Sequence, residues 1–205
     1  MIIFNPPEKS YAGYIFDCDG TLANSMPLHL DAWNHGLAAA NASLRIDGRN
    51  FMSVAGMALI QTIEHWNKTH SLQVDAEIVV EAKNSYFEAH RSTIQPITPV
   101  TDFARRCKLN GAAVSVASGG TRVDVLETLD SIGLGELFLV VVTAEDVKRA
   151  KPAPDLFLLA AEKMGIAPSD CLVIEDSPLG VEGAELAGMD SILIPHVFDE
   201  ERETG

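Results

Sequence analysis

The stretch YIFDCDGT, residues 14–21, decides the fold. Its first three residues are apolar and suit a buried strand, and the chain then becomes polar at Asp17. The carboxylates of Asp17 and Asp19 therefore follow the carboxyl end of a strand, where open α/β sheets bind their ligands. Neighbouring carboxylates repel each other, so this pair requires a cation or a shared proton. For the motif taken alone, the plainer alternative is an acidic turn with solvated side chains.

Four further apolar runs continue this pattern toward the C-terminus and alternate with helical segments. They occupy residues 112–117, 137–142, 171–174 and 191–194. Strands that alternate with helices are typical of a parallel sheet whose faces are covered by the helices. The sequence therefore predicts an α/β fold with a parallel sheet.

A helical segment interrupts the strand pattern between residues 25 and 94. Apolar side chains recur there at helical spacing, for example Ile63 and Trp66, as in amphipathic helices that pack on one another. We expect an α/β core domain made of residues 1–24 and 95–205. The helical segment, residues 25–94, then forms a subdomain inserted between the first two strands.

The composition excludes several classes of partner. Of the 205 residues 47% are hydrophobic, and 29 acidic against 15 basic side chains give a net charge of −14, which opposes binding to nucleic acid or anionic membranes. No stretch approaches the roughly 20 apolar residues of a membrane span, and the N-terminus lacks signal-peptide order. The scattered Cys18, Cys107 and Cys171 indicate neither a disulfide framework nor a zinc site, but buried side chains. We expect a cytoplasmic monomer whose partner is a small molecule.

A second acidic pair follows the run at residues 171–174. Glu175 and Asp176 precede Ser177-Pro178, which has the pattern of a helix N-cap and first turn. Taken alone, the pair is explained by the favourable effect of negative charge at a helix start. Together with Asp17, however, it brings carboxylates from two strand ends to one edge of the sheet. Oxygen ligands without histidine or cysteine favour Mg²⁺.

Two further segments are suited to binding an anion. Residues 118–121, SGGT, lie between a predicted strand and a predicted helix, so the Ser118 hydroxyl and neighbouring amide groups can bind phosphate, although an ordinary turn is the alternative. Lys151 stands out from solvated lysines because Pro152 and Pro154 fix the backbone around it. Carboxylates, a Mg²⁺ site, an anion-binding turn and a lysine together indicate phosphoryl transfer.

Four motifs in a fixed order give this combination its specificity. They are FDCDGTLANS at residues 16–25, VASGG at 116–120, KPAPDLF at 151–157 and IEDSPLGVEGAELAGMD at 174–190. In this order they resemble the haloacid dehalogenase-like hydrolase superfamily, and in particular its β-phosphoglucomutase-like phosphatases. The resemblance implies a Rossmann-like three-layer α/β/α core, and it makes the inserted helical segment a cap.

The resemblance also implies the catalytic and metal-binding roles. It makes Asp17 the nucleophile that becomes an aspartyl phosphate, and Asp19 the general acid and base. It implies that Mg²⁺ is bound by Asp17, Asp176 and the backbone carbonyl of Asp19. Glu175 would lie in or next to that coordination shell.

Further implied residues contact the substrate. The phosphoryl oxygens would be held by Ser118, Gly119 and Lys151. In the cap, substrate-facing positions of the family correspond to His29, Trp33 and Lys83. A histidine or tryptophan on an amphipathic helix, however, more often belongs to a core than to a ligand site.

The expected reaction is hydrolysis of a small sugar phosphate similar to fructose 1-phosphate, because the stretch that begins at Lys151 is similar to the fructose-1-phosphatase-like branch. Mutase-type members carry an arginine shortly after a cap glycine, to bind a second phosphate, whereas MALIQTIEHW follows Gly56 here. Gly120 and Thr121 also replace polar and basic residues of mutases, although Arg122 could compensate. Two alternatives stay open: a β-phosphoglucomutase that interconverts β-glucose 1-phosphate and glucose 6-phosphate, and a phosphate- or metal-binding protein without turnover.

Overall fold

The computed structural model of the protein describes residues 4–54, 57, 59–195 and 198. The chain divides into two compact units, one formed by Met1–Asn24 with Gln95–Gly205 and the other by Ser25–Ile94. No helix in the described part of the chain is long and apolar enough to span a membrane.

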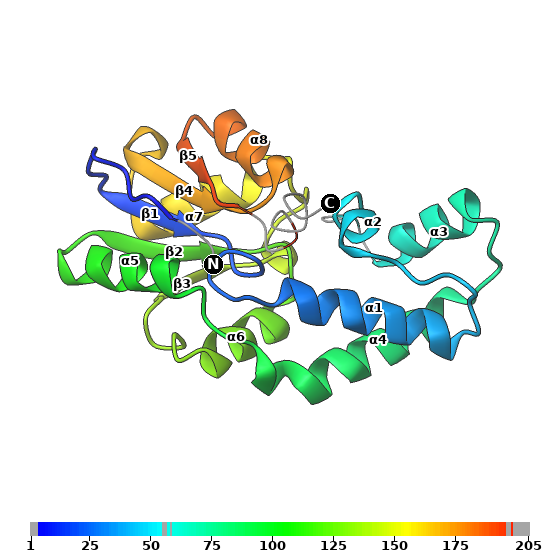
Figure 1. Ribbon diagram of the computed structural model, residues 1–205. Coiled ribbons are helices and arrows are strands. Elements are labelled where there is room, and N and C mark those ends of the chain that lie inside the picture. Colours follow the sequence, from blue (N-terminus) through cyan, green and yellow to red (C-terminus); the bar gives the residue numbers. More distant parts are fainter. Residues whose placement is uncertain (1–3, 55–56, 58, 196–197, 199–205) are drawn as a thin grey trace. The chain divides into compact units, whose positions relative to one another are not determined.

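The first unit is built on a five-stranded parallel sheet, which confirms the predicted α/β class (Figure 1). The strand order is β3-β2-β1-β4-β5, so the strand order reverses beside β1, where sheets of this type bind ligands. The strands are β1 Gly13–Phe16, β2 Ala113–Ala117, β3 Val140–Val142, β4 Cys171–Glu175 and β5 Asp190–Leu193.

Strand register brings the predicted site residues to one edge of this sheet. Phe16 at the end of β1 lies opposite Val116 of β2 and Ile174 of β4. The three central strands therefore end nearly level with one another. Asp17 and Ser118, which directly follow β1 and β2, and Glu175, the last residue of β4, therefore lie at the same edge of the sheet.

The two faces of the sheet are covered by different helices. Ile15 belongs to a buried cluster with Leu156 and Phe157 of α7, whereas the next residue, Phe16, lies 6.2 Å from the ring of Phe103 on α5. Because successive side chains of a strand point to opposite faces, α5 and α7 lie on opposite sides, which gives three layers. The helices of this unit are α5 Thr98–Leu109, α6 Arg122–Ser131, α7 Asp155–Met164 and α8 Pro178–Leu186, with 3₁₀ turns η2 Ala144–Asp146 and η3 Pro168–Asp170.

One strand is shorter than the sequence predicts. The apolar run at residues 137–142 forms a strand only over its last three residues. Leu137 instead donates its N–H to the Leu134 carbonyl in a turn, and Leu139 is 91% exposed. β3 lies at the edge of the sheet and pairs with residues 115–117 of β2, whereas Ala113 and Val114 at the start of β2 have no partner in β3.

The second unit is helical where the apolar spacing predicts helices. Trp33 of α1 and Trp66 of α3 meet edge to face with ring centroids 5.1 Å apart. α1 and α4 pack so closely that a Cβ at Gly36 would overlap the Val79 carbonyl oxygen. The elements are α1 Met26–Ala39, α2 Gly48–Met52, α3 Leu59–Thr69, α4 Ala76–His90 and the 3₁₀ turn η1 Arg91–Thr93. The short α2 was not predicted, since five residues are too few to show a helical period.

Candidate active site

The turn after β1 holds the first acidic pair. The backbone N–H of Asp17 donates to the Ile174 carbonyl of β4 at 2.9 Å, and the Asp17 residue is 6% exposed. The chain then folds back on itself, with the Gly20 N–H donating to the Ala23 carbonyl at 2.8 Å. Gly20 has a φ of +85°, which favours glycine. In this turn Asp19 forms an isolated β-bridge with Ala23, and Asp19 is partly exposed to solvent.

The second acidic pair lies at the end of β4, and hydrogen bonds from the following residues fix its glutamate, which is the last residue of the strand. Glu175 is 1% exposed, and its Oε2 accepts hydrogen bonds from the N–H and Oγ of Ser177 at 2.8 and 2.9 Å. Ser177 also caps α8, since its Oγ accepts the Gly180 N–H at 3.1 Å, which confirms the predicted N-cap. A Cβ at Gly180 would overlap the Glu175 carboxyl group, so this close approach depends on glycine.

Lys151 joins the two acidic pairs from a third segment, the loop before α7. Its Nζ donates to Oδ1 of Asp17 at 2.6 Å and to Oε1 of Glu175. The Lys151 side chain is 11% exposed, whereas the neighbouring Lys148 is exposed as expected. Arg149 is also exposed but forms an ion pair with Asp155 at 2.6 Å. Of these three basic residues, the one directly before Pro152 is therefore the one that reaches the strand ends.

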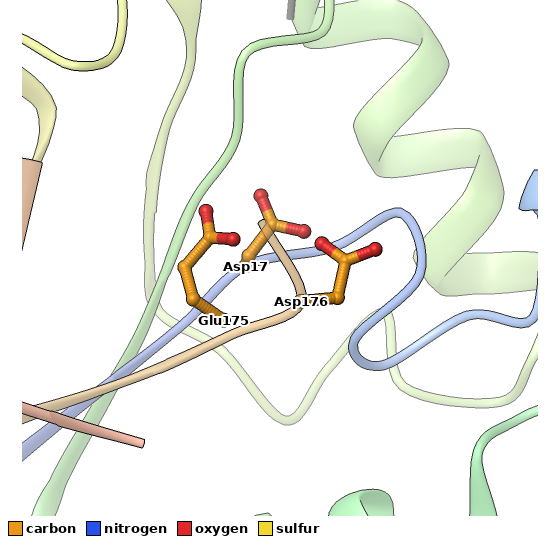
Figure 2. A group of neighbouring side chains, drawn as sticks. All are labelled: Asp17, Glu175 and Asp176. Atoms are coloured by element: carbon orange, nitrogen blue, oxygen red, sulfur yellow. The ribbon is translucent and has the colours of Figure 1, made fainter. Parts of the chain in front are cut away.

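Three buried carboxylates lie together at this edge. Asp17, Glu175 and Asp176 each offer an oxygen, and these oxygens lie within 4.8 Å of one another (Figure 2). Burial raises the pKa of the Asp17 carboxyl well above its usual range; Lys151 counteracts this, whereas Glu175 and Asp176 raise it further. Burial alone would lower the pKa of Lys151, but Asp17 and Glu175 raise it above its usual value, so the ammonium stays charged.

This arrangement fits a hard divalent cation. All three donors are carboxylate oxygens, the type that Mg²⁺ prefers. One ammonium balances only part of the charge of three buried carboxylates, and the raised pKa of Asp17 shows that its ionised form lacks compensation. A cation among these oxygens would supply what is missing.

The SGGT turn lies next to the acidic residues. Ser118 at the end of β2 is 2% exposed, and its Oγ accepts the Gly120 N–H at 3.1 Å, which leaves its hydroxyl proton to donate. Among the described hydrogen bonds, the Gly119 N–H has no acceptor, and a Cβ at Gly119 would meet nothing within 4 Å. A Cβ at Gly120 would lie 3.5 Å from Ser118 Oγ and 4.0 Å from Asp19 Oδ2. Gly120 of the turn therefore lies close to the Asp19 carboxyl group.

The three cap residues predicted to contact substrate all lie in the helical unit and are linked through Lys83 and Phe87. The rings of His29 and Phe87 stack at 4.2 Å, and Lys83 Nζ lies 5.5 Å from the Phe87 ring and 5.7 Å from that of Trp33. Trp33 is 4% exposed and belongs to the helical core. The contact of these residues with substrate stays a prediction, and Gly56 lies outside the described residues.

Sequence reasoning missed two features of these sites. Phe87, at the centre of the helical cluster, was not singled out, although its spacing of four residues from Lys83 places both on one helix face. Asp146 was also missed. It lies in η2 and pairs with Arg122 at 2.5 Å, beside the SGGT turn. The pair is 24 residues apart in sequence, so no local pattern indicates it.

Comparison with known proteins places these observations in a family. Residues 14–194 match the model of the haloacid dehalogenase-like hydrolases. The chain is 32% identical to the fructose-1-phosphate phosphatase YqaB of Escherichia coli over 90% of this chain and 96% of that protein. It is 33% identical to hexitol phosphatase A of the same organism, over 93% of this chain and 86% of that protein.

A solved structure shows the same fold. CbbY from Rhodobacter sphaeroides in complex with phosphate superposes with a TM-score of 0.80 over 92% of this chain and 88% of that one, at 24% identity. The motifs expected from the sequence, the parallel sheet and the two similar phosphatases agree with one another. The chain belongs to the haloacid dehalogenase-like hydrolase family.

Proposed function

We propose that this protein is a Mg²⁺-dependent phosphatase that hydrolyses small sugar phosphates, of the type of fructose 1-phosphate, through a phosphoryl group carried on Asp17. The observation that carries the proposal is the buried contact of Lys151 with Asp17 and Glu175, at the point where three parallel strands end together. A phosphate dianion can bind among carboxylates only where cations outweigh them locally.

The class of reaction follows from the family. The chain is a phosphoric monoester hydrolase, since its family is one of hydrolases and its relatives include two phosphatases named for sugar or hexitol phosphates. The substrate itself is the finer part of the proposal, at 32% identity to the fructose-1-phosphate phosphatase.

In the first step, a carboxylate oxygen of Asp17 attacks phosphorus, and the bond between phosphorus and the sugar oxygen breaks. Asp19 donates a proton to the departing alkoxide, which leaves as the sugar hydroxyl. The Ser118 hydroxyl and the Gly119 N–H donate to the phosphoryl oxygens, and the Lys151 ammonium balances their charge. The proximity of the Asp19 carboxyl to Gly120 of the SGGT turn supports this role.

In the second step, water attacks the phosphorus of the aspartyl phosphate. Asp19, now ionised, takes the proton of that water, and the bond between phosphorus and Asp17 breaks. Inorganic phosphate is released, and both aspartates regain their original protonation states. Hydrolysis therefore needs a single group that donates a proton and later accepts one.

The metal would be held by the carboxylates of Asp17 and Asp176 and the backbone carbonyl of Asp19. When bound, Mg²⁺ supplies charge neutralisation and polarises a phosphoryl oxygen. Glu175 has a different role in this proposal. Both its oxygens accept hydrogen bonds from Lys151 or Ser177, so it orients the lysine next to the coordination shell.

A phosphate-release assay tests the proposal. Purified protein is incubated with fructose 1-phosphate, hexose 6-phosphates, hexitol phosphates and phosphoglycolate, each with Mg²⁺ or with a chelator. We expect multiple turnovers on at least one sugar or hexitol phosphate, only when Mg²⁺ is present. Release limited to phosphoglycolate would contradict the substrate class, and equal release in chelator would contradict the metal requirement.

A further inference from the structure

Arg122, the first residue of α6, connects two loops at the edge of the sheet. Its guanidinium donates to Oδ2 of Asp146 at 2.5 Å and to the Val141 carbonyl at 3.3 Å. Its backbone N–H donates to Oε2 of Glu145 at 2.9 Å. Both the side chain and the backbone of Arg122 therefore bind the segment that follows β3.

The Asp146 carboxylate accepts several hydrogen bonds in that segment. Its Oδ2 also accepts from the N–H and Oγ1 of Thr143, at 2.8 and 3.1 Å, and Lys163 of α7 lies 3.8 Å from Oδ1. Burial alone would raise the pKa of Asp146, but hydrogen bonds from Thr143 and Arg122 lower it to about 2. The carboxylate is thus ionised at any pH at which the enzyme would work.

The end of β3 and the segment that follows it contact residues 118–122, which comprise the SGGT turn and Arg122, at three points. The Ser118 N–H donates to the Val142 carbonyl at 3.0 Å, and the Gly120 carbonyl accepts the Ala144 N–H at 3.3 Å. Arg122 forms the third point. Two consecutive glycines give the turn little conformational preference of its own, so its shape depends on such external contacts.

We propose that Arg122 and Asp146 form a clamp that positions the Ser118 hydroxyl and the Gly119 N–H for the phosphoryl oxygens of the substrate. This inference rests on the proposed function and assigns the pair a positioning role in it. In this proposal Arg122 does not take the role of the basic residue that mutases carry, because its guanidinium is already bound to Asp146 and to the Val141 carbonyl.

Kinetics of Arg122→Gln test the clamp. Loosening the turn weakens contacts that are made to substrate and transition state alike, so we expect KM to rise by about tenfold with kcat nearly unchanged. The dissociation constant of inorganic phosphate, measured calorimetrically with Mg²⁺, should rise by a similar factor. Arg122→Lys, which keeps one charged donor, should recover part of both losses. An ordinary surface ion pair would leave both constants unchanged.

Arg105→Gln is the matched control. Arg105 is 43% exposed, pairs with Asp102 at 3.5 Å and donates to the Gly133 carbonyl at 3.5 Å, so it resembles Arg122 in exposure and contacts. It lies on α5 and makes no contact with the turn among the described hydrogen bonds. We expect this variant to match the wild type in KM and in phosphate binding. A rise in either equal to that of Arg122→Gln would overturn the clamp.

Amide hydrogen exchange separates the clamp from the proposed function. Exchange at residues 118–121 should accelerate in Arg122→Gln and stay unchanged in Arg105→Gln, whether or not any substrate is turned over. Unchanged exchange in Arg122→Gln would overturn the clamp. An inactive wild type with accelerated exchange in Arg122→Gln would instead contradict the proposed function and retain the clamp.

Discussion

At the scale of single residues, the buried charges of the site lower the stability of the fold. Asp17, Glu175 and Asp176 are each at most 7% exposed, and Lys151 is the cation that contacts two of them in the described part of the chain. Burial is the largest cause that raises the pKa of Asp17, and the neighbouring charges of Glu175 and Asp176 raise it further. Such a cluster lowers the stability of the fold, as buried charges at functional sites commonly do.

The repulsion among these carboxylates should appear as a difference in melting temperature between the wild type and a charge-removing variant when no metal is bound. In chelator, Asp17→Asn removes one of three crowded charges, so we expect its melting temperature to lie about 2–4 °C above that of the wild type. Added Mg²⁺ should stabilise the wild type more than the variant, since the variant has lost a charged ligand. Differential scanning calorimetry measures both. A variant less stable than the wild type in chelator would show that the Lys151 contact outweighs the repulsion.

Asp146 illustrates the opposite case, a carboxylate that stabilises the fold. Its pKa is lowered to about 2, below the ordinary value of an unfolded chain, so its ionised form favours the folded state. This contribution is complete above about pH 4 and is lost as the pH falls through about 2. We expect Asp146→Asn to cost about 1–2 kcal/mol at pH 7, and the difference from wild type to shrink below pH 4 in urea titrations. A difference that does not change with pH would contradict the assigned cause.

At the scale of elements, the site depends on how tightly β4 and α8 approach each other. A Cβ at Gly180 would overlap the Glu175 carboxyl, which in turn binds Lys151. Gly180→Ala should therefore displace Glu175, destabilise the protein by about 1–3 kcal/mol and reduce kcat. Gly119→Ala is the comparison for stability, because a Cβ there meets nothing within 4 Å. Equal stability of the two variants in urea unfolding would contradict this account.

The elements also show which parts of the fold could be predicted from the sequence and which could not. The strands that position Asp17 and Glu175 were predicted, because buried parallel strands produce apolar runs that end sharply at polar residues. The length of β3 was not, since pairing with β2 decides which apolar residues join the sheet. The clustering of Asp17, Glu175 and Asp176 was expected from the strand ends, whereas the pairing of Arg122 with Asp146 follows from the positions of two loops in space.

At the scale of the whole molecule, the net charge of −14 and the binding of an anion are compatible. In the proposed function, the field that a substrate meets is set locally by Lys151, the amide groups of the SGGT turn and a bound cation, not by the overall charge. The helical unit, residues 25–94, contributes the choice of substrate in the proposed function. In that unit His29 and Lys83 contact Phe87, and Lys83 also contacts Trp33; the role of His29, Trp33 and Lys83 in this choice stays a prediction.

The choice between phosphatase and mutase is tested on the intact protein. A mutase needs a second cationic site for a sugar bisphosphate, and the segment after Gly56 carries no arginine. We expect added glucose 1,6-bisphosphate not to support conversion of β-glucose 1-phosphate into glucose 6-phosphate at a rate comparable to phosphate release. Both products are followed in one reaction. Isomerisation faster than phosphate release would make the protein a mutase.

The central claim is that Asp17 carries the phosphoryl group, and acid quenching during turnover tests it most directly. Wild-type protein is mixed with Mg²⁺ and its best sugar phosphate, quenched within milliseconds and digested for mass spectrometry. The account predicts one added phosphoryl group on the peptide that contains Asp17, and neither this adduct nor phosphate release in Asp17→Asn. Phosphate release by Asp17→Asn at a rate near that of the wild type would contradict the claim.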